Sequence, residues 1–267
     1  MVNQAAGSPD RLTEVAPGVL VATSSFALTT TTVVVGSPGS GGCLLIDPAV
    51  TVAELAGLAA DLTTLGLCPA AAWSTHPHWD HVLWSRELGD APRYAAPAAV
   101  RTSQAERDTL LGEANQAAPG HDPSLIGQLI PLDAAAIPWD GPAARVIIHN
   151  AHAPGHGAVF LPGTGILVAG DMCSDVETPL LNLVADDPLC DYRTGLGRLA
   201  GVPGVRRVVP GHGHVGDAEA FRQRLAADSA YLDALALGQP FGDPRLTVDS
   251  EQWLRAVHDK QVRFFRR

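Results

Sequence analysis

The segment Thr75-His76-Pro77-His78-Trp79-Asp80-His81 decides how this sequence is interpreted, because it places three imidazoles and one carboxylate within six residues. Imidazole nitrogen and carboxylate oxygen both suit zinc, and imidazole also suits iron. His76 and His78 are two residues apart, so an extended backbone points both rings to one side. Asp80 and His81 follow directly and can face a second point nearby. The segment therefore predicts a metal-binding loop rather than a polar surface loop that is rich in histidine by chance.

Three later segments each add one residue of a metal-binding type on a turn that glycine brackets. They are Ala153-Pro154-Gly155-His156-Gly157, Val168-Ala169-Gly170-Asp171 and Val209-Pro210-Gly211-His212-Gly213. Each adjoins a short apolar run that is typical of a β-strand, and glycine lets the backbone approach a metal closely. With the first segment, they supply five histidines and two aspartates. This set is large enough for two ions that share a carboxylate and a water.

Composition narrows the classes of protein and partner. The 267 residues include 18 Lys and Arg against 28 Asp and Glu, a formal charge of −10, which argues against a nucleic-acid partner. No apolar run approaches the ~18 residues that span a bilayer, so we expect neither an integral membrane protein nor a membrane partner. The N-terminus shows no secretion signal, and the four cysteines form no CxxC pair. We therefore expect a cytoplasmic protein that acts on a small molecule.

The order of expected elements indicates an α/β fold, with strands, helix, strand and helix occurring twice in succession. We expect residues 1–12 to form a flexible tail and residues 13–267 to form a single domain, because no linker interrupts the chain. Two irregular stretches, residues 115–139 and 172–190, are expected to build the substrate pocket. The predicted helices cover residues 51–67, 98–116, 191–199, a segment after the cap Asp217, and 250–262.

Four motifs in a fixed order, HxHxDH, PGH before a strand, GD and PGHG, resemble the metallo-β-lactamase fold superfamily. The similarity extends from about residue 15 to about residue 225. It implies an αββα sandwich, in which two mixed β-sheets face each other, helices flank them and the metals lie at one edge. It also implies two zinc ions per chain, with iron or manganese as alternatives.

The resemblance implies a role for each candidate residue. His76, His78 and His156 would bind the first metal. Asp80, His81 and His212 would bind the second. Asp171 would bridge the two, and Asp47 would orient a ligand histidine from behind. The roles of two other residues are left undecided by the resemblance. His152 could contact a metal ligand without binding the metal, line the pocket or be exposed to solvent. Cys173 is expected to be a packed thiol rather than a ligand.

The bridging Asp171 resembles glyoxalase II, the lactonases and the phosphodiesterases of this fold, and argues against true metallo-β-lactamases. We expect a dinuclear zinc hydrolase in which a metal-bridging hydroxide, oriented by Asp80, attacks an ester, thioester or lactone. Phosphodiester cleavage on the same metals is the alternative, with β-lactam hydrolysis a third. A different class, a mononuclear iron enzyme that oxidises persulfides, would use two histidines and one aspartate and would leave His81 without a role.

Overall fold

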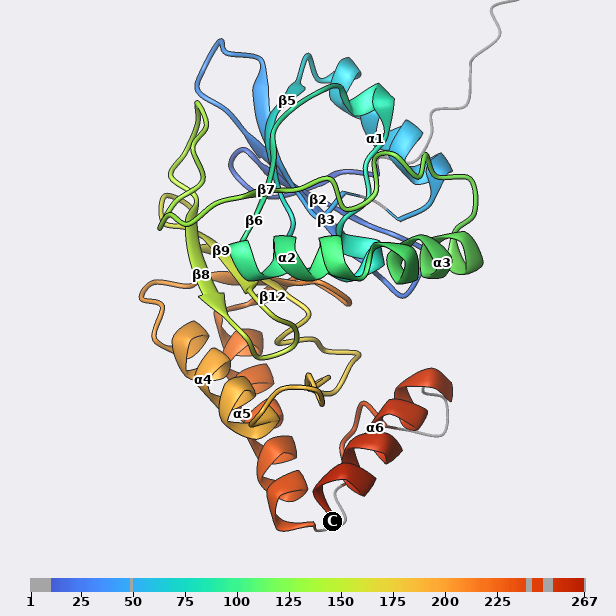
Figure 1. Ribbon diagram of the computed structural model, residues 1–267. Coiled ribbons are helices and arrows are strands. Elements are labelled where there is room, and N and C mark those ends of the chain that lie inside the picture. Colours follow the sequence, from blue (N-terminus) through green and yellow to red (C-terminus); the bar gives the residue numbers. More distant parts are fainter. Residues whose placement is uncertain (1–10, 49, 239–241, 247–251, 267) are drawn as a thin grey trace, which may run out of the picture.

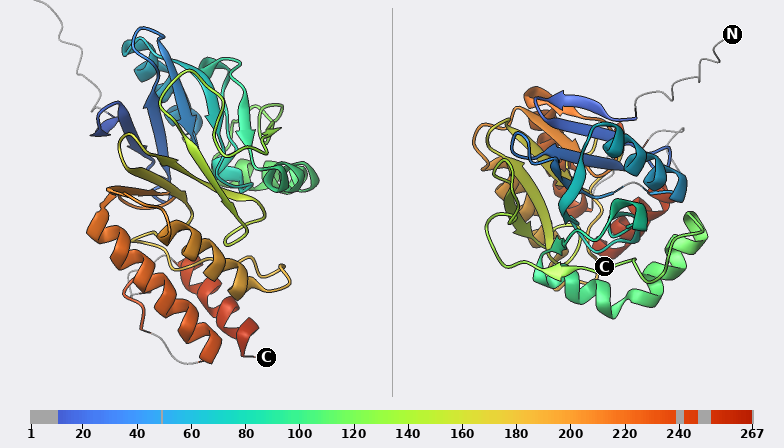
Figure 2. Two further views of the ribbon diagram at one scale, coloured as in Figure 1. Left: turned by 90° about the vertical axis from the view of Figure 1, so that its left-hand side faces the viewer. Right: turned by 90° about the horizontal axis from the view of Figure 1, so that it is seen from above.

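Two β-sheets packed face to face form the centre of the protein, and helices cover both outer sides (Figures 1 and 2). The structure is a computed structural model that describes residues 11–48, 50–238, 242–246 and 252–266. The expected αββα sandwich of two mixed sheets is confirmed. The expected tail at residues 1–12 lies almost wholly outside the described residues.

The first sheet has seven strands in chain order. Strands β1 to β4 pair antiparallel, and β4 to β7 pair parallel. The strands are β1 (Thr13–Ala16), β2 (Val19–Thr23), β3 (Thr30–Val35), β4 (Gly42–Ile46), β5 (Cys68–Trp73), β6 (Arg93–Ala95) and β7 (Ile130–Pro131).

The second sheet has five strands in the order β12-β11-β10-β9-β8. Only β10 and β11 pair parallel, and the other pairs are antiparallel. The strands are β8 (Arg145–His149), β9 (His156–Leu161), β10 (Ile166–Gly170), β11 (Arg207–Pro210) and β12 (Gly216–Asp217).

Helix α1 covers the first sheet, whereas α4 and α5 cover the second, where α4 contacts β8 and α5 contacts β11 and β12. Helix α6 packs against α5 beyond the sandwich (Figure 1). The α-helices are α1 (Val52–Thr64), α2 (Pro97–Ala105), α3 (Arg107–Ala117), α4 (Pro188–Ala200), α5 (Ala218–Leu237) and α6 (Gln252–Phe265). Two single 3-10 turns, Trp79–His81 and Arg86–Leu88, lie between β5 and β6.

Two apolar clusters hold the layers together. The larger one joins α1 and the first sheet to the inner face of the second sheet, so Leu45 of β4 and Val168 of β10 belong to the same core. The smaller one joins the outer face of the second sheet to α4 and α5, through residues such as Leu167 and Leu232. Alternate residues of β10 therefore face opposite layers, as a buried strand between two apolar surfaces requires.

The strand directions bring the expected metal-binding segments to one edge of the sandwich. Strands β4 and β5 are parallel, so Asp47 and the segment 75–81 leave the first sheet on the same side. Strands β10 and β11 are also parallel, so Asp171 and His212 leave the second sheet together. Loops at strand ends on a rigid scaffold commonly carry functional groups.

Two helices begin at the capping residues that the sequence contains. Helix α1 begins after Thr51, whose hydroxyl accepts a hydrogen bond from the Glu54 amide at 3.2 Å, while the Glu54 carboxylate accepts one from the Thr51 amide at 2.9 Å. Asp217 caps α5 by accepting a hydrogen bond from the Ala220 amide, as predicted. The predicted helix 98–116 is wrong in one respect, because the chain breaks at Glu106 into α2 and α3. Within the described residues, no helix combines the length and apolar character needed to cross a membrane.

Candidate metal centre

Three histidines and one aspartate converge at the edge of the sandwich. The Nδ1 atom of His78 lies 3.1 Å from Nε2 of His76 and 2.9 Å from Nε2 of His152. The Oδ2 atom of Asp171 lies 3.4 Å from both of those Nε2 atoms. These four residues form one group that could hold a metal ion.

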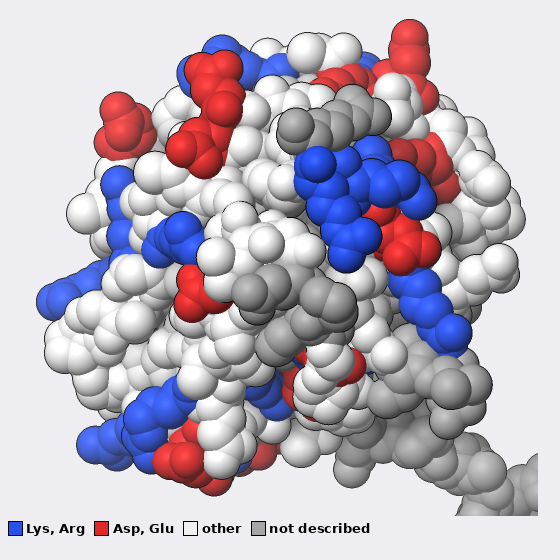
Figure 3. Space-filling view, turned by 90° about the horizontal axis from the view of Figure 1, so that it is seen from below, with Lys and Arg blue, Asp and Glu red and all other residues white. Residues whose placement is uncertain are grey.

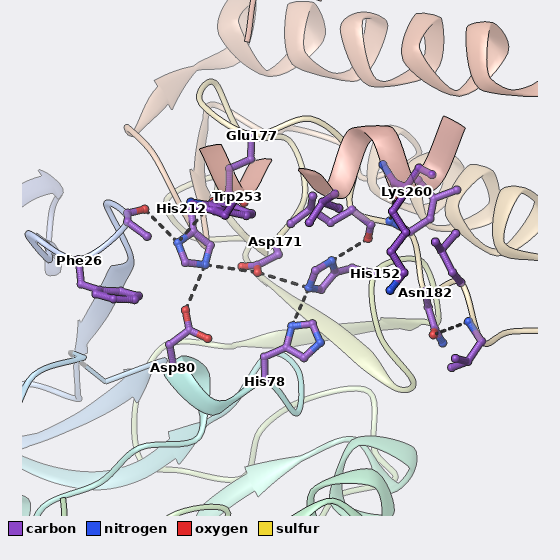
Figure 4. A pocket seen from close by; sticks show the side chains of 17 residues that line it. Phe26, His78, Asp80, His152, Asp171, Glu177, Asn182, His212, Trp253 and Lys260 are labelled. Atoms are coloured by element: carbon purple, nitrogen blue, oxygen red, sulfur yellow. Dashed lines mark hydrogen bonds and ion pairs between the residues drawn. The ribbon is translucent and has the colours of Figure 1, made fainter. Parts of the chain in front are cut away.

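A second group lies directly beside the first. Nε2 of His212 is 3.3 Å from Nε2 of His81 and 3.3 Å from Oδ2 of Asp80. Asp171 faces this group as well, with Oδ1 at 3.2 Å from Nε2 of His81 and Oδ2 at 3.4 Å from Nε2 of His212. The Asp171 carboxylate therefore lies between the two groups, and Figure 4 shows it between His152 and His212.

The spacing of these atoms fits tetrahedral coordination. Four ligands at about 2.0–2.1 Å from a zinc ion lie about 3.3–3.4 Å from one another. Asp171 Oδ1 is buried and makes no hydrogen bond, although it lies 3.2 Å from Nε2 of His81, so it can serve as a ligand atom for a cation. Ring nitrogens that lie within 3.1 Å of each other cannot all be N–H donors, which indicates unprotonated nitrogens that face a common cation. The residues present therefore fit two divalent ions.

The two groups contain five histidines, and four of these are held in place by a contact to the ring nitrogen that faces away from the group. Nδ1 of His152 lies 2.8 Å from the Leu180 carbonyl, and Nδ1 of His212 lies 3.0 Å from the Ala27 carbonyl. Nδ1 of His76 lies 3.0 Å from the Thr75 hydroxyl. A contact of this kind sets the tautomer and directs the other nitrogen toward a metal.

Asp47 supports the fourth of these histidines, as the resemblance implied. Its Oδ2 lies 3.0 Å from Nδ1 of His81 and accepts a hydrogen bond from the Thr75 hydroxyl at 2.6 Å, while its Oδ1 accepts one from the Thr75 amide. The backbone of Asp47 has a φ of 49°, which is uncommon for a residue other than glycine. The three contacts of its carboxylate hold this conformation and tie the end of β4 to the segment after β5.

The protonation states of His76 and His152 suit metal binding, whereas at His81 and His212 burial is outweighed by the surrounding carboxylates, which raise the pKa of both rings well above its usual value. Burial is the main cause that lowers the pKa of His152 to about 3 and takes the pKa of His76 well below its usual range. Both rings are therefore neutral near pH 7, the form that binds metals. Burial opposes ionisation of Asp171, but the neighbouring His212 and His81 outweigh it and hold the pKa of that carboxyl well below its usual range.

One expected ligand is not in either group. His156 is the first residue of β9 and fully buried, and its Nε2 donates a hydrogen bond to the Ala169 carbonyl at 3.0 Å. His152, in the turn before β9, occupies the place expected for it. The reason is the turn at Gly155, where φ is 69°, which directs residue 152 toward the edge and residue 156 between the strands. The structure thus brings His152, and not the expected His156, into the first group.

The other expected residues are where the motifs indicated. His76, His78, Asp80, His81, Asp171 and His212 all belong to the two groups. Gly211 is essential to this packing, because a Cβ atom there would collide with Oδ1 of Asp171. Cys173 is fully buried in the apolar cluster under α4 and α5, as expected of a packed thiol, and burial raises the pKa of that thiol well above its usual value. All four cysteines are free.

A pocket of about 540 Å³ opens onto both groups. Its lining includes His78, Asp80, His152, Asp171 and His212, and beyond them Phe26, Glu177, residues 180–184 and one face of α6. The expectation that residues 172–190 contribute is confirmed. The expectation for residues 115–139 is wrong, since none of the described residues of that stretch lines this pocket, whereas residues of α6 do.

Glu177 is a site residue that the sequence did not indicate. Its side chain is buried, and one carboxylate oxygen lies 3.8 Å from Nδ1 of His212. With Asp171 and His212 it forms a third group of metal-binding types. Burial is the main cause that raises the pKa of Glu177 to about 7. The segment around it has no regular hydrophobic period, which is why no pattern marked it.

Comparisons with known proteins agree with this geometry. Residues 26–212 match the family profile described as the metallo-beta-lactamase superfamily. A beta-lactamase domain protein from Burkholderia ambifaria has a similar structure, with a TM-score of 0.67 and 20% identity over 88% of this chain and 77% of that one. A metallo-beta-lactamase family protein from Thermus thermophilus gives 0.64 and 22%, over 84% and 83%. TTHA1623, solved in a di-iron-bound form, gives 0.60 and 26%, over 76% and 97%. No curated protein matches the chain by sequence.

Proposed function

Because the chain belongs to the metallo-beta-lactamase superfamily, we propose that it is a metal-dependent hydrolase acting on an ester, thioester or lactone of a small molecule. The observation that carries the proposal is the pair of ligand groups that share Asp171. We assign the first metal to His76, His78, His152 and Asp171, and the second to Asp80, His81, His212 and Asp171.

Two divalent ions held there would lower the pKa of a shared water toward ~7 and polarise the carbonyl of the substrate. The chain's own residues supply the rest. Asp80 faces both the second group and the pocket, so its carboxylate can accept a hydrogen bond from the attacking water and orient it. The mostly apolar residues 180–184 exclude other water from the reacting bond, which strengthens the electrostatic interactions within the pocket.

Zinc suits the ligand set best, since every proposed ligand atom is an imidazole nitrogen or a carboxylate oxygen. Iron suits it as well, and the 26% identical TTHA1623 is a di-iron-bound form, so iron is the second candidate metal, with manganese third. Phosphodiester hydrolysis is the second candidate reaction, because a pair of metals also stabilises in-line displacement at phosphorus. A mononuclear iron oxygenase is disfavoured, because the group of Asp80, His81 and His212 would have no role in it.

Metal content and a substrate panel test the proposal together. The purified chain, saturated with zinc, is expected to hold two ions per chain by elemental analysis. It should hydrolyse at least one member of a panel of lactones, thioesters and aryl esters faster than aryl phosphodiesters or cephalosporins. One ion per chain, or turnover of the phosphodiesters alone, would overturn the dinuclear or the carboxyl-ester part of the proposal respectively.

The variant Asp171→Asn keeps the shape of the central side chain but removes its charge. We expect it to lose about one of two metal ions and at least ~100-fold of the hydrolytic rate, because both groups depend on this carboxylate. Asp233→Asn, an exposed residue of α5, is the matched control and should keep both ions. Full metal content and turnover in Asp171→Asn would show that the carboxylate is not shared.

A further inference from the structure

Lys260 is the only lysine among the 267 residues, and it lies on the wall of the pocket that opens onto the metal centre. Trp253, Val257 and Lys260 follow the spacing i, i+4, i+7, so they share one face of α6. That face lines the pocket. Lys260 is also exposed to solvent, so a ligand that enters the pocket can reach its side chain.

The neighbouring Gln261 fixes this face of α6 in position. Its side chain is fully buried, and its Oε1 accepts a hydrogen bond from the Leu181 amide at 2.6 Å. Its Nε2 donates hydrogen bonds to the Pro179 carbonyl at 3.0 Å and to the Tyr231 hydroxyl at 2.9 Å. Lys260 is therefore carried by a helix that is tied both to α5 and to the adjoining loop at residues 179–181.

The charges that face the pocket are unevenly placed. Apart from the proposed ligands, its lining holds one cation, Lys260, and one carboxylate, Glu177, within the described residues. Figure 4 shows Lys260 and Asn182 on the side of His152, and Phe26 on the side of His212, with Asp171 between. Glu177 lies close to His212, at 3.8 Å from its Nδ1. A ligand that spans the metal centre thus meets a positive charge at one end only.

The walls between these charged groups are mostly apolar, with Asn182 and Gln261 as polar exceptions. The apolar part is formed by Phe26, Leu180, Leu181, Leu183, Val184, Trp253 and Val257. Arg245, on a hollow that adjoins the pocket at Phe26 and Trp253, is paired with Asp228 at 2.6 Å and Asp243 at 2.8 Å. Figure 3 shows Lys and Arg beside Asp and Glu on the face seen from below. Outside the proposed metal centre, Lys260 is the one cation of the described lining that can bind an anion in the pocket.

We propose that Lys260 binds the carboxylate of a singly charged substrate whose apolar chain lies along α6 and whose scissile acyl bond lies over the metal centre. The proposal rests on the proposed hydrolase function and names its substrate class. A single ammonium group matches a single negative charge, and the described lining at the far end, near Glu177, offers no second cation to another anionic group. The carboxylate fixes which end of the substrate faces His152.

A binding experiment tests the role of Lys260 without any turnover. The zinc-loaded chain is titrated calorimetrically with 4-phenylbutyrate and with the neutral 4-phenylbutyramide. In Lys260→Met we expect the affinity for the carboxylate relative to the amide to fall about 5- to 10-fold, and in Lys260→Arg to stay within about 2-fold. Arg263→Met, which removes an exposed cation from the same helix, is the control for long-range charge. An unchanged ratio in Lys260→Met means that the carboxylate binds the metals alone, and overturns the proposal.

The single lysine also allows direct observation. Reductive methylation with ¹³C-formaldehyde keeps the charge and labels only Lys260 and the N-terminal amine. The dimethyl-lysine NMR signal is expected to shift, with saturation, on titration with 4-phenylbutyrate and not with the amide. A signal that stays fixed at saturating carboxylate contradicts a contact with Lys260.

Kinetics separate this proposal from the proposed function. The substrates are mono-4-nitrophenyl glutarate and 4-nitrophenyl pentanoate, which match in length and differ in the terminal carboxylate. The ratio of their kcat/KM values should fall about 5- to 10-fold in Lys260→Met, mainly through KM, and should not change in Arg263→Met. Hydrolysis of both esters with an unchanged ratio in Lys260→Met refutes the substrate class alone. Hydrolysis of neither ester counts against the ester-hydrolase function, while the binding experiment still decides the role of Lys260.

Discussion

His152 and His156 differ in what their ring nitrogens face, and this difference is open to test. In His152→Gln the first group loses a ligand, so we expect metal content to fall from about two ions to about one per chain. In His156→Gln both ions should remain, because the side chain contacts the Ala169 carbonyl rather than the groups. The variant should instead lose ~1–3 kcal/mol of unfolding free energy, since it disturbs a buried hydrogen bond. Elemental analysis and urea unfolding measure both quantities, and the reverse pattern would restore His156 as the ligand.

Asp47 acts on the centre only through His81 and Thr75. Asp47→Asn keeps the shape and tolerates the positive φ, but it weakens the contact that directs His81. We expect zinc affinity to fall about 10- to 100-fold, measured by competition with a chromophoric chelator. Asp90→Asn, an exposed aspartate, should leave the affinity unchanged. Wild-type affinity in Asp47→Asn would show that packing alone orients His81.

Most residues of the candidate metal centre could be predicted from the sequence. The HxHxDH, GD and PGHG motifs each place a metal-binding residue at a fixed position relative to the end of a strand. His152 could not be predicted, since two histidines four residues apart flank one turn, and the sequence does not show which of them enters the strand. The backbone at Gly155 decides this, and a positive φ is a property of the folded turn.

At the scale of elements, α6 completes the pocket, and Gln261 is its anchor. Gln261→Met keeps the volume but leaves the Leu181 amide and the Pro179 carbonyl buried without partners. We expect a loss of ~2–3 kcal/mol of unfolding free energy and a higher KM with unchanged metal content, because the wall at residues 180–184 loosens. Gln252→Met, on an exposed position of α6, is the control. An unchanged KM despite the lost stability would mean that α6 does not shape substrate binding.

The sequence predicts where a helix begins better than which surface it covers. Pro97 and Asp217 mark helix starts by known physical preferences, and both are found there. The break at Glu106 has no glycine or proline to signal it. Nor does the sequence show that α6 meets residues 180–184, because a contact between residues 80 apart, such as Leu181 and Gln261, depends on how α5 directs the chain back toward the metal centre.

For the whole molecule, the metal centre joins the two sheets. Asp47 and residues 75–81 come from the first sheet, whereas His152, Asp171 and His212 come from the second. Ions held by the two groups would therefore cross-link two layers that otherwise meet through apolar packing. Because a ligand at about 100 times its dissociation constant stabilises the folded state by about 2.7 kcal/mol, removal of zinc should lower Tm by roughly 5–10 °C.

Calorimetry of the zinc-loaded and chelator-treated chain measures this shift, and added zinc should reverse it. The size of the shift depends on Asp171, since only this residue contributes to both groups. In Asp171→Asn the response to zinc should be smaller than in the wild type, because the second ion no longer shares a carboxylate with the first. In His156→Gln the zinc response should match the wild type even though the baseline Tm is lower. An equal response in Asp171→Asn and the wild type would mean that the two groups bind their ions independently and that the ions do not act as one link between the sheets.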